Sequence, residues 1–322
     1  MTRSAELRSA AAGAGRRLGE LALVMAVAVL VGFVVTRLMP GDAASVMLDG
    51  QAADPEFTQR LRKAAGIDEP LWRQFATYVT GLLRGDLGLS LRYGGTPVAA
   101  LISEAAPTTL LLATAALLVA TPAGLGAGLL SVRWRGKWPD GVVTAGSVVA
   151  LSLSPVVLAT WLMLAAVAVR GGGPSVEGVA WVFTLAAPVG ALAIMPAGVI
   201  ARITRAQLLE VLGQDYVRCA RAKGLSETAI LVRHALPNAL AGVITVAGTA
   251  AGTILTSTAV VETVFNLPGL GRLAIFSVLA RDYPLAGAVI LVFALAQVVI
   301  SFAVDLLIAV IDPRARGRMS GP

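Results

Sequence analysis

The sequence predicts an all-α polytopic membrane protein, and three observations lead to this prediction. Hydrophobic residues make up 57% of the 322 positions, charged residues only 14%, and the mean hydropathy is +0.79. Soluble domains carry roughly 45–50% apolar and about 25% charged residues, so lipid is the expected solvent of this chain. About six stretches are long and apolar enough to span a bilayer as helices, and basic residues cluster on one predicted side of them.

Each predicted span supplies the roughly 20 residues that a helix needs to cross the hydrocarbon core. The approximate ranges are 18–38, 107–131, 141–169, 179–203, 239–263 and 285–311. The apolar run of the first stretch is longer than the roughly 7–15 residues of a signal peptide, so we expect it to be retained. Pro122, Pro155, Pro188 and Pro196 should kink their spans, because proline removes a backbone hydrogen bond.

Basic residues concentrate in four segments that we assign to one side of the membrane. These are the residues before 18, the loops 132–140 and 204–238, and the tail 312–322, which together hold most of the 26 Lys and Arg residues. The basic residues of 39–106 are matched there by acidic ones, and long loops weigh little in orientation. We therefore predict that both termini and the two short loops face the cytoplasm, an N-in/C-in arrangement.

The segment 39–106 is too long for a bare connection and contains two amphipathic patterns. One runs from Pro55 to Gly66 and the other from Pro70 to Gly85, each with proline near its start and glycine beyond its end. In the second, Leu71, Phe75, Tyr78, Val79 and Leu82 recur at helical spacing. We favour a small helical cap on the outer membrane face over a ligand-binding domain.

The domain organisation predicted from these elements has four segments. They are an N-terminal segment with the first span (1–38), an extracytoplasmic helical scaffold (39–106), a core of five spans (107–311) that contains the cytoplasmic loop 204–238, and a cytoplasmic tail (312–322).

Several polar groups lie in or beside the spans, among them two carboxylates and an amide. A carboxylate at membrane depth costs at least about 2.5 kcal/mol, so it normally faces a cavity or a partner. Glu262 and Asp305 are both near predicted interfaces. For Glu262, a cap on the following loop and a pathway contact are equally plausible, and for Asp305 we favour a packing or cytoplasmic-end role over a proton relay. Gln297 has two open roles, a hydrogen bond to another helix or a place in the pathway.

Small residues mark where helices can approach closely. Gly124, Gly126 and Gly128 lie in the second span, and Gly248 and Gly252 form a Gly-x-x-x-Gly pair in the fifth. We expect tight contacts inside one bundle, with a dimer seam or a translocation path as the sharper alternative.

The sequence excludes several classes of site. It contains no P-loop motif, since the only Gly-Lys pair, Gly136-Lys137, is followed by Trp138. A single histidine, His234, and a single cysteine, Cys219, cannot supply the usual metal sites or a disulfide. We expect no catalytic site, no metal and no cofactor bound by this chain. The net charge of +7 fits membrane topology better than nucleic acid, which we do not expect as a partner.

The polar insert between Asp215 and Pro237 is the most informative segment. Asp215 is an acceptable N-cap, and the residues that follow give a short cationic helix. Gly224 suits a left-handed position at the end of that helix, and Ser226 can cap a second one. Pro237 fits the first turn of the next span. We therefore predict two short helices that meet at a bend on the cytoplasmic face.

At these residues the sequence resembles binding-protein-dependent ABC importer permeases. Gly224, Leu236 and Pro237 keep the spacing of their "EAA" loop, although Arg218-Cys219-Ala220 replaces the EAA triplet and His234 the usual isoleucine. A closer resemblance is to the B-type permease subunit of dipeptide, oligopeptide and nickel importers. It is carried in family order by Met39–Asp42, Gly66–Leu71, Gly85–Ser90, Pro107–Leu110, Asp215–Arg218, Ala220–Leu225, Arg233–Leu236, Val261–Phe265, Pro268–Gly271, Arg281–Pro284 and Asp312–Arg314. Ala43 stands where that family usually has proline.

The resemblance implies a type I importer permease fold, in a multi-pass protein of the bacterial inner membrane that forms half of a translocation pathway for peptides or a nickel-type solute. Implied partners are a second, C-type permease, two cytoplasmic ATPases that use ATP and Mg, and an extracytoplasmic solute-binding protein. The implied ATPase-coupling residues are Asp215, Tyr216, Arg218, Ala220, Arg221, Ala222, Lys223 and Gly224. Leu236 and Pro237 would form a hinge at the start of the fifth span. An external loop near the substrate exit would contain Glu262, Phe265, Pro268, Gly269 and Gly271.

Two other classes of function remain as alternatives. A stand-alone, ion-coupled secondary transporter would use Glu262 and Asp305 as its ion sites. A membrane scaffold without transport activity would have no continuous polar pathway between its spans. Peptide and nickel permeases share these motifs, so peptides are the default substrate class.

Overall fold

The computed structural model describes residues 19, 22–34, 69–90, 92–169 and 185–311. The predicted helix after Pro55 and the tail 312–322 lie outside these residues. Regular structure in the described part is helical, apart from an isolated bridge between Leu89 and Pro97. The all-α prediction is confirmed. The chain divides into two compact units, one comprising the described residues up to Thr109 with Pro268–Val298, the other Leu110–Leu267 with the described residues from Val299 onward.

Four of the described helices are long and apolar enough to cross a membrane. They are α5 (Val98–Arg133), α9 (Ala187–Leu212), α12 (Leu236–Val264) and α14 (Tyr283–Ile311). A fifth span results if α6 (Trp138–Ser152) and α7 (Pro155–Val169) are one bent span. A shorter apolar helix, Ala22–Val34, covers part of the predicted first span. The described residues thus contain four or five spans where the sequence predicts about six.

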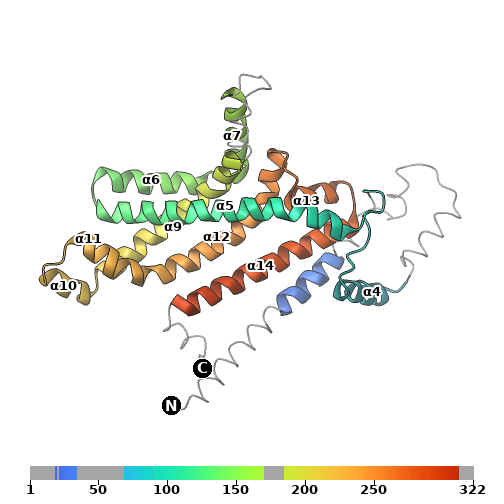
Figure 1. Cartoon of the computed structure of the whole chain (residues 1–322), viewed down its shortest axis with the longest axis horizontal. Helices are drawn as coiled ribbons and strands as arrows, with labels where there is room; N and C mark the ends of the chain where they lie inside the picture. Colours follow the sequence, from blue (N-terminus) through green and yellow to red (C-terminus); the bar gives the residue numbers. More distant parts are fainter. Residues whose placement is uncertain (1–18, 20–21, 35–68, 91, 170–184, 312–322) are drawn as a thin grey trace, which may run out of the picture. The chain divides into compact units, whose positions relative to one another are not determined.

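The predicted third span, 141–169, is not one straight helix. It consists of α6 and α7, which are bent by 100° at the break between Ser152 and Pro155. Figure 1 shows α7 leaving the direction of α6 at this break. Leu153 is extended (φ −86°, ψ 120°), and the Ser154 hydroxyl accepts a hydrogen bond from the Val156 N–H at 3.4 Å. Proline disfavours the helical conformation for the residue before it, so Pro155 starts a new helix rather than kinking an old one.

The fourth span also differs from its predicted bounds of 179–203. Helix α9 continues to Leu212, so residues 204–212 of the predicted loop are helical. Ile200, Thr204 and Leu208 are fully buried at intervals of four residues, which keeps one face of the helix packed beyond the last apolar run. Pro188 lies in the first turn of α9, where a missing N–H is tolerated, instead of kinking the span.

In the second unit, α9 is the central helix, and α6, α7 and α12 pack against it. The main apolar cluster joins residues of α5, α7, α9 and α12, including Leu112, Leu158, Leu192 and Ile254. All of these side chains are buried. A second apolar cluster, which includes Leu208, Ala235 and Ala239, holds the C-terminal end of α9 against the N-terminal end of α12, and the 215–237 segment connects those two ends.

Glycines set the distance between α5 and α9. A Cβ atom at Gly124 would lie 2.6 Å from the Ala197 carbonyl oxygen, and one at Gly128 would lie 2.6 Å from Thr204 Cβ. Gly248 of α12 is in similarly close contact with Val304 of α14. The predicted tight contacts within one bundle are confirmed at these positions. Gly126 differs, because a Cβ there meets no atom within 4 Å.

The first unit contains α4 (Leu71–Leu83) and α13 (Leu270–Leu279). Helix α4 confirms the second amphipathic prediction, with Pro70 before it and Gly85 at φ +76° after it. Phe33 contacts Phe75 edge-on at a centroid distance of 5.2 Å, which packs α4 against Ala22–Val34. Leu71, the first of the regularly spaced apolar residues, occupies the first position of the helix and is 65% exposed.

Asp282 organises the N-terminal end of α14. Its buried carboxylate accepts hydrogen bonds from the Ser90 hydroxyl and from the Arg92 N–H, the latter at 3.2 Å. It also accepts from the Leu285 N–H at 3.4 Å, within the first turn of the helix. A negative charge at the N-terminal end of a helix interacts favourably with the helix dipole. Asp282 therefore ties the segment before α5 to α14.

Gly128→Val should destabilise the protein, because the added side chain meets Thr204 and the α9 backbone. We expect a loss of about 1–3 kcal/mol, measured as a lower thermal midpoint by size-exclusion chromatography in detergent. Gly126→Val adds the same side chain to the open face of the same helix and is the matched control. Equal midpoints for the two variants would contradict the glycine contact.

Candidate functional site

The segment between α9 and α12 folds as a helical elbow. Helix α10 (Asp215–Ala222) follows α9 after a short turn, and α11 (Glu227–Ile230) follows α10 after the bend at Gly224. A π-helical turn, η2 (Leu231–Ala235), then leads into α12. In Figure 1, α10 and α11 lie at the shared end of α9 and α12. We call residues 213–230 the elbow.

The bend between the two short helices has the predicted chemistry. Gly224 has φ +80°, its N–H donates to the Arg221 carbonyl at 2.9 Å, and the Leu225 N–H donates to the Ala220 carbonyl at 3.3 Å. This pair of bonds is the Schellman arrangement, in which glycine is the favoured residue. The Ser226 hydroxyl accepts from the Ala229 N–H at 3.3 Å, which confirms Ser226 as the N-cap of α11.

Asp215 is not the N-cap of α10. Gln214 occupies that position with an extended backbone, and Asp215 lies in the first turn. Its carboxylate lies 3.3 Å from the Arg218 guanidinium, and both side chains are exposed. The carboxylate still lies at the positive end of the helix, where an acidic residue is favourable.

A small apolar cluster makes the elbow a rigid body. Val217, Ala220 and Ile230 are buried against one another, and Leu212 at the end of α9 packs on them. Of the predicted coupling residues, Ala220 therefore faces inward and holds α10 on α11. The side chains of Tyr216, Arg218 and Lys223 are exposed and form a polar outer face.

An ion pair joins the two arms of the elbow across the bend. Arg221 donates to the two carboxylate oxygens of Glu227 at 2.7 and 3.1 Å. These hydrogen bonds hold the pKa of the Glu227 carboxyl below its usual value. The contribution of this ion pair to the free energy of unfolding is therefore complete above the pKa of a glutamate in the unfolded chain. It is lost only as acid protonates Glu227. The sequence prediction missed Glu227, because six residues across a glycine bend is not a helical spacing.

Tyr216 connects the outer face of α10 to α12. The Asn238 amide nitrogen lies 3.2 Å from the Tyr216 hydroxyl, to which it donates, and it also donates to the His234 carbonyl at 2.7 Å. Asn238 lies in the first turn of α12, so movement of α10 has a direct path to the start of that span.

The predicted hinge at Leu236 and Pro237 lies within continuous helix. Helix α12 begins at Leu236 with Pro237 in its first turn, but the preceding residues form the π turn and keep helical backbone angles. A π turn accommodates the missing N–H and the ring of proline without a chain break. The hinge role stays a prediction, and any bending there would occur in the π turn.

The residues of the predicted external loop belong to two different units. Glu262 and Phe265 end α12 in the second unit, where the Glu262 side chain is fully buried and its carbonyl accepts from the Leu267 N–H at 2.8 Å. Pro268, Gly269 and Gly271 belong to the first unit, where Gly269 is the N-cap of α13. Their role near a substrate exit stays a prediction.

The structure also shows a polar cluster that the sequence prediction missed. Asp140 accepts from Arg205 at 2.9 and 3.1 Å, from the Ser131 hydroxyl, and from the Gly136 N–H at 3.1 Å. Asp140 is buried, and Arg205 is about two-thirds buried. The cluster therefore fixes the α5–α6 turn to the C-terminal part of α9, shortly before the elbow begins. The sequence pattern placed Arg205 in the basic loop 204–238, because it did not predict that residues 204–212 are helical.

Comparisons with known proteins give a consistent result. Residues 120–317 match the binding-protein-dependent transport system inner membrane component family, and residues 14–113 match the N-terminal family of the same systems. The chain is 38% identical over 301 residues to the glutathione transport system permease protein GsiC of Escherichia coli strain K12, covering 94% of this chain and 97% of GsiC. GsiC of Shigella flexneri serotype 5b gives the same identity and coverage.

The fold has relatives among solved structures. It is similar to a chain of the MetNI methionine ABC transporter in an inward-facing crystal form, with a TM-score of 0.56 and 22% identity over 66% of this chain and 97% of that chain. A second inward-facing crystal form of the same transporter gives a TM-score of 0.55. These similarities confirm the importer permease fold.

Arg205→Gln should destabilise the protein by about 3 kcal/mol, because it leaves the buried Asp140 carboxylate without its charged partner. The thermal midpoint in detergent measures this loss. Arg202→Gln removes an exposed charge from the same helix and should have little effect. The double variant Arg205→Gln with Asp140→Asn should be more stable than Arg205→Gln alone, and a double variant that is no better would show that the ion pair is not the cause.

Proposed function

The chain belongs to the family of binding-protein-dependent transport system inner membrane components, and from this premise we propose that its elbow is the contact for an ATPase subunit. It is a translocation-pathway subunit of an ABC importer in the bacterial inner membrane. As a transporter permease it is not a nucleotide-binding enzyme. Its family implies ATPase and solute-binding-protein partners.

The observation that carries this proposal is a rigid, cationic elbow between two spans. The buried cluster of Val217, Ala220 and Ile230 fixes α10 to α11, and the Arg221–Glu227 pair closes the bend from outside. A force on the outer face would therefore move α10 as one body instead of unfolding it. Such a body suits the coupling residues inferred from the family resemblance.

The same contacts supply a route into the membrane. Leu212 connects the elbow to α9, and the Asn238–Tyr216 hydrogen bond connects it to the first turn of α12. Since η2 and α12 are continuous helix, a displacement of α10 turns or tilts α12 as a unit. A rigid lever of this kind biases a packed bundle between two arrangements, which is the coupling that transport driven by ATP requires.

The proposed assembly contains this chain, a second C-type permease, two ATPases that bind ATP and Mg, and an extracytoplasmic solute-binding protein. This chain would form half of the pathway and bind no cofactor itself. Glu262, Phe265, Pro268, Gly269 and Gly271 would lie near the substrate exit of the binding protein.

We assign small peptides as the substrate class. The glutathione transport system permease proteins cover nearly the whole chain at 38% identity, and glutathione is itself a small peptide. A nickel-type solute shares the family motifs but has no such support here. An ion-coupled carrier working alone is disfavoured, because the chain belongs to a family of permeases that work with binding proteins.

Cys219 allows the ATPase contact to be tested without an added cysteine. It is exposed on α10 and is the only cysteine of the chain. A photoreactive maleimide on Cys219 should crosslink this chain to an ATPase subunit in the intact complex, as detected by mass spectrometry. The variant Cys219→Ser with Ser103→Cys moves the label to an exposed site on α5 and should not crosslink to the ATPase. Crosslinks from Cys219 to lipid or to the binding protein alone would refute the assignment.

Gly224→Pro should uncouple the complex, because proline cannot adopt the positive φ of this position. We expect loss of the ATPase stimulation by substrate-loaded binding protein in the reconstituted complex, with the basal ATPase activity retained. Gly224→Asn is the matched control, since asparagine tolerates the left-handed conformation. Stimulation that survives in Gly224→Pro would exclude the elbow as the coupling element.

A further inference from the structure

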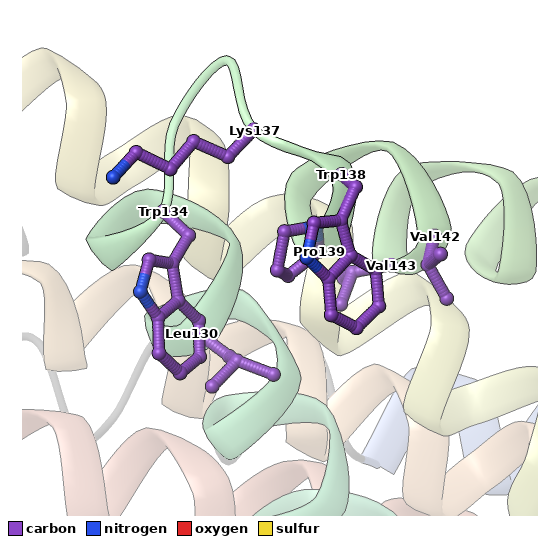
Figure 2. Close-up of a pocket in the computed structure, with 7 residues that line it drawn as sticks. All are labelled: Leu130, Trp134, Lys137, Trp138, Pro139, Val142 and Val143. Carbon is purple, nitrogen blue, oxygen red and sulfur yellow. The ribbon is translucent and has the colours of Figure 1, made fainter.

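An open groove lies on the α5–α6 turn, on the face away from α9. Its volume is about 400 Å³, and Figure 2 shows the indole rings of Trp134 and Trp138 on its two sides, with Leu130 below Trp134. Val142 of α6 continues the apolar lining, and Lys137 forms part of the rim. Trp138 is 80% exposed, so these aromatic surfaces are not part of the bundle core.

The groove combines an apolar floor with a cationic rim. Arg133, Arg135 and Lys137 are all exposed on the turn. The one carboxylate in the sequence of the turn, Asp140, points to the opposite side, where Arg205, Ser131 and the Gly136 N–H bind it. Asp140 therefore does not neutralise Lys137, the basic residue that lines the groove, and Arg135 adds positive charge on the same turn, whereas Arg133 acts on Glu227 of the elbow. This positive charge favours an anionic ligand with an apolar body.

The position of the groove fits the same ligand. Trp134 and Trp138 stand at the ends of two apolar helices, and tryptophan is enriched at this level of membrane proteins, where hydrocarbon meets headgroups. Basic residues beside the cytoplasmic end of a span attract anionic lipids, and basic pockets between spans bind their headgroups. The charge distribution of the sequence assigns the 132–140 loop to that side of the membrane.

We propose that this groove is a binding site for an anionic phospholipid. One acyl chain lies between the two indole rings over Leu130 and Val142, and the phosphate is bound by the Lys137 ammonium, with Arg135 on the same turn adding positive charge. The lipid is held on the outer face of the turn whose inner face is fixed to α9 by Asp140. This site is separate from the elbow and does not depend on its coupling role.

The test uses the full chain in nanodiscs, with tryptophan kept only at Trp134 or only at Trp138 and phenylalanine at the other tryptophan positions. The probes are phosphatidylglycerol and phosphatidylcholine, each brominated on one acyl chain and added at equal mole fraction. Brominated phosphatidylglycerol should quench both tryptophans at a lower mole fraction than brominated phosphatidylcholine. Equal quenching by the two lipids overturns the proposal, because it shows general bilayer contact without selection of charge.

Lys137→Gln should weaken the preference for phosphatidylglycerol about fivefold, the factor that corresponds to roughly 1 kcal/mol for one basic residue at the surface. Lys223→Gln makes the same change at the exposed C-cap of α10 and should leave the preference unaltered. An unchanged preference in Lys137→Gln refutes the assigned headgroup contact. Thermal midpoints equal to wild type confirm that both variants are folded.

Native mass spectrometry of the intact importer gives an independent readout. Phosphatidylglycerol should stay bound to wild-type complex and to Lys223→Gln, and be lost from Lys137→Gln at lower collision energy. Tryptophans that are shielded from both brominated lipids in the intact complex would show that a protein subunit covers the groove, which would overturn the lipid assignment.

Discussion

The close approach of α5 to α9 is the constraint on which the second unit depends. Within a membrane the hydrophobic effect gives two apolar helices little reason to associate, so contact area between their backbones has to supply the attraction. Gly124 and Gly128 provide that area by removing side chains from the crossing. The crossing brings the α5–α6 turn to α9, where Asp140 meets Arg205, and it sets the direction in which α9 presents the elbow.

Local and tertiary interactions make different contributions to the position of the elbow. Local chemistry forms the bend, since Gly224 and Ser226 satisfy the backbone at the two helix ends. Packing of Val217 on Ile230 then fixes the angle between the helices. Only after both does the outer face of α10 become a defined surface, and that surface is what a partner can bind.

Sequence patterns predicted the features that depend on neighbouring residues. Hydrophobic runs located α5, α12 and α14 to within a few residues, except that α5 starts earlier at Val98, and turn chemistry located the elbow. Features that depend on distant contacts were missed. The extension of α9 to Leu212 requires the burial of Thr204 and Leu208 by other helices, and the Arg205–Asp140 pair joins residues 65 positions apart. Pro155 signalled an interruption, but proline alone does not distinguish a kink from a 100° break.

The π turn at Leu231–Ala235 has a consequence for how the elbow and α12 are phased. A π turn holds one more residue than an α-helical turn, and one residue corresponds to about 100° of rotation around a helix axis. Side chains before and after it therefore follow different angular registers. Deletion of a single residue within the π turn would remove this offset and rotate the whole elbow relative to the face of α12 that packs in the bundle.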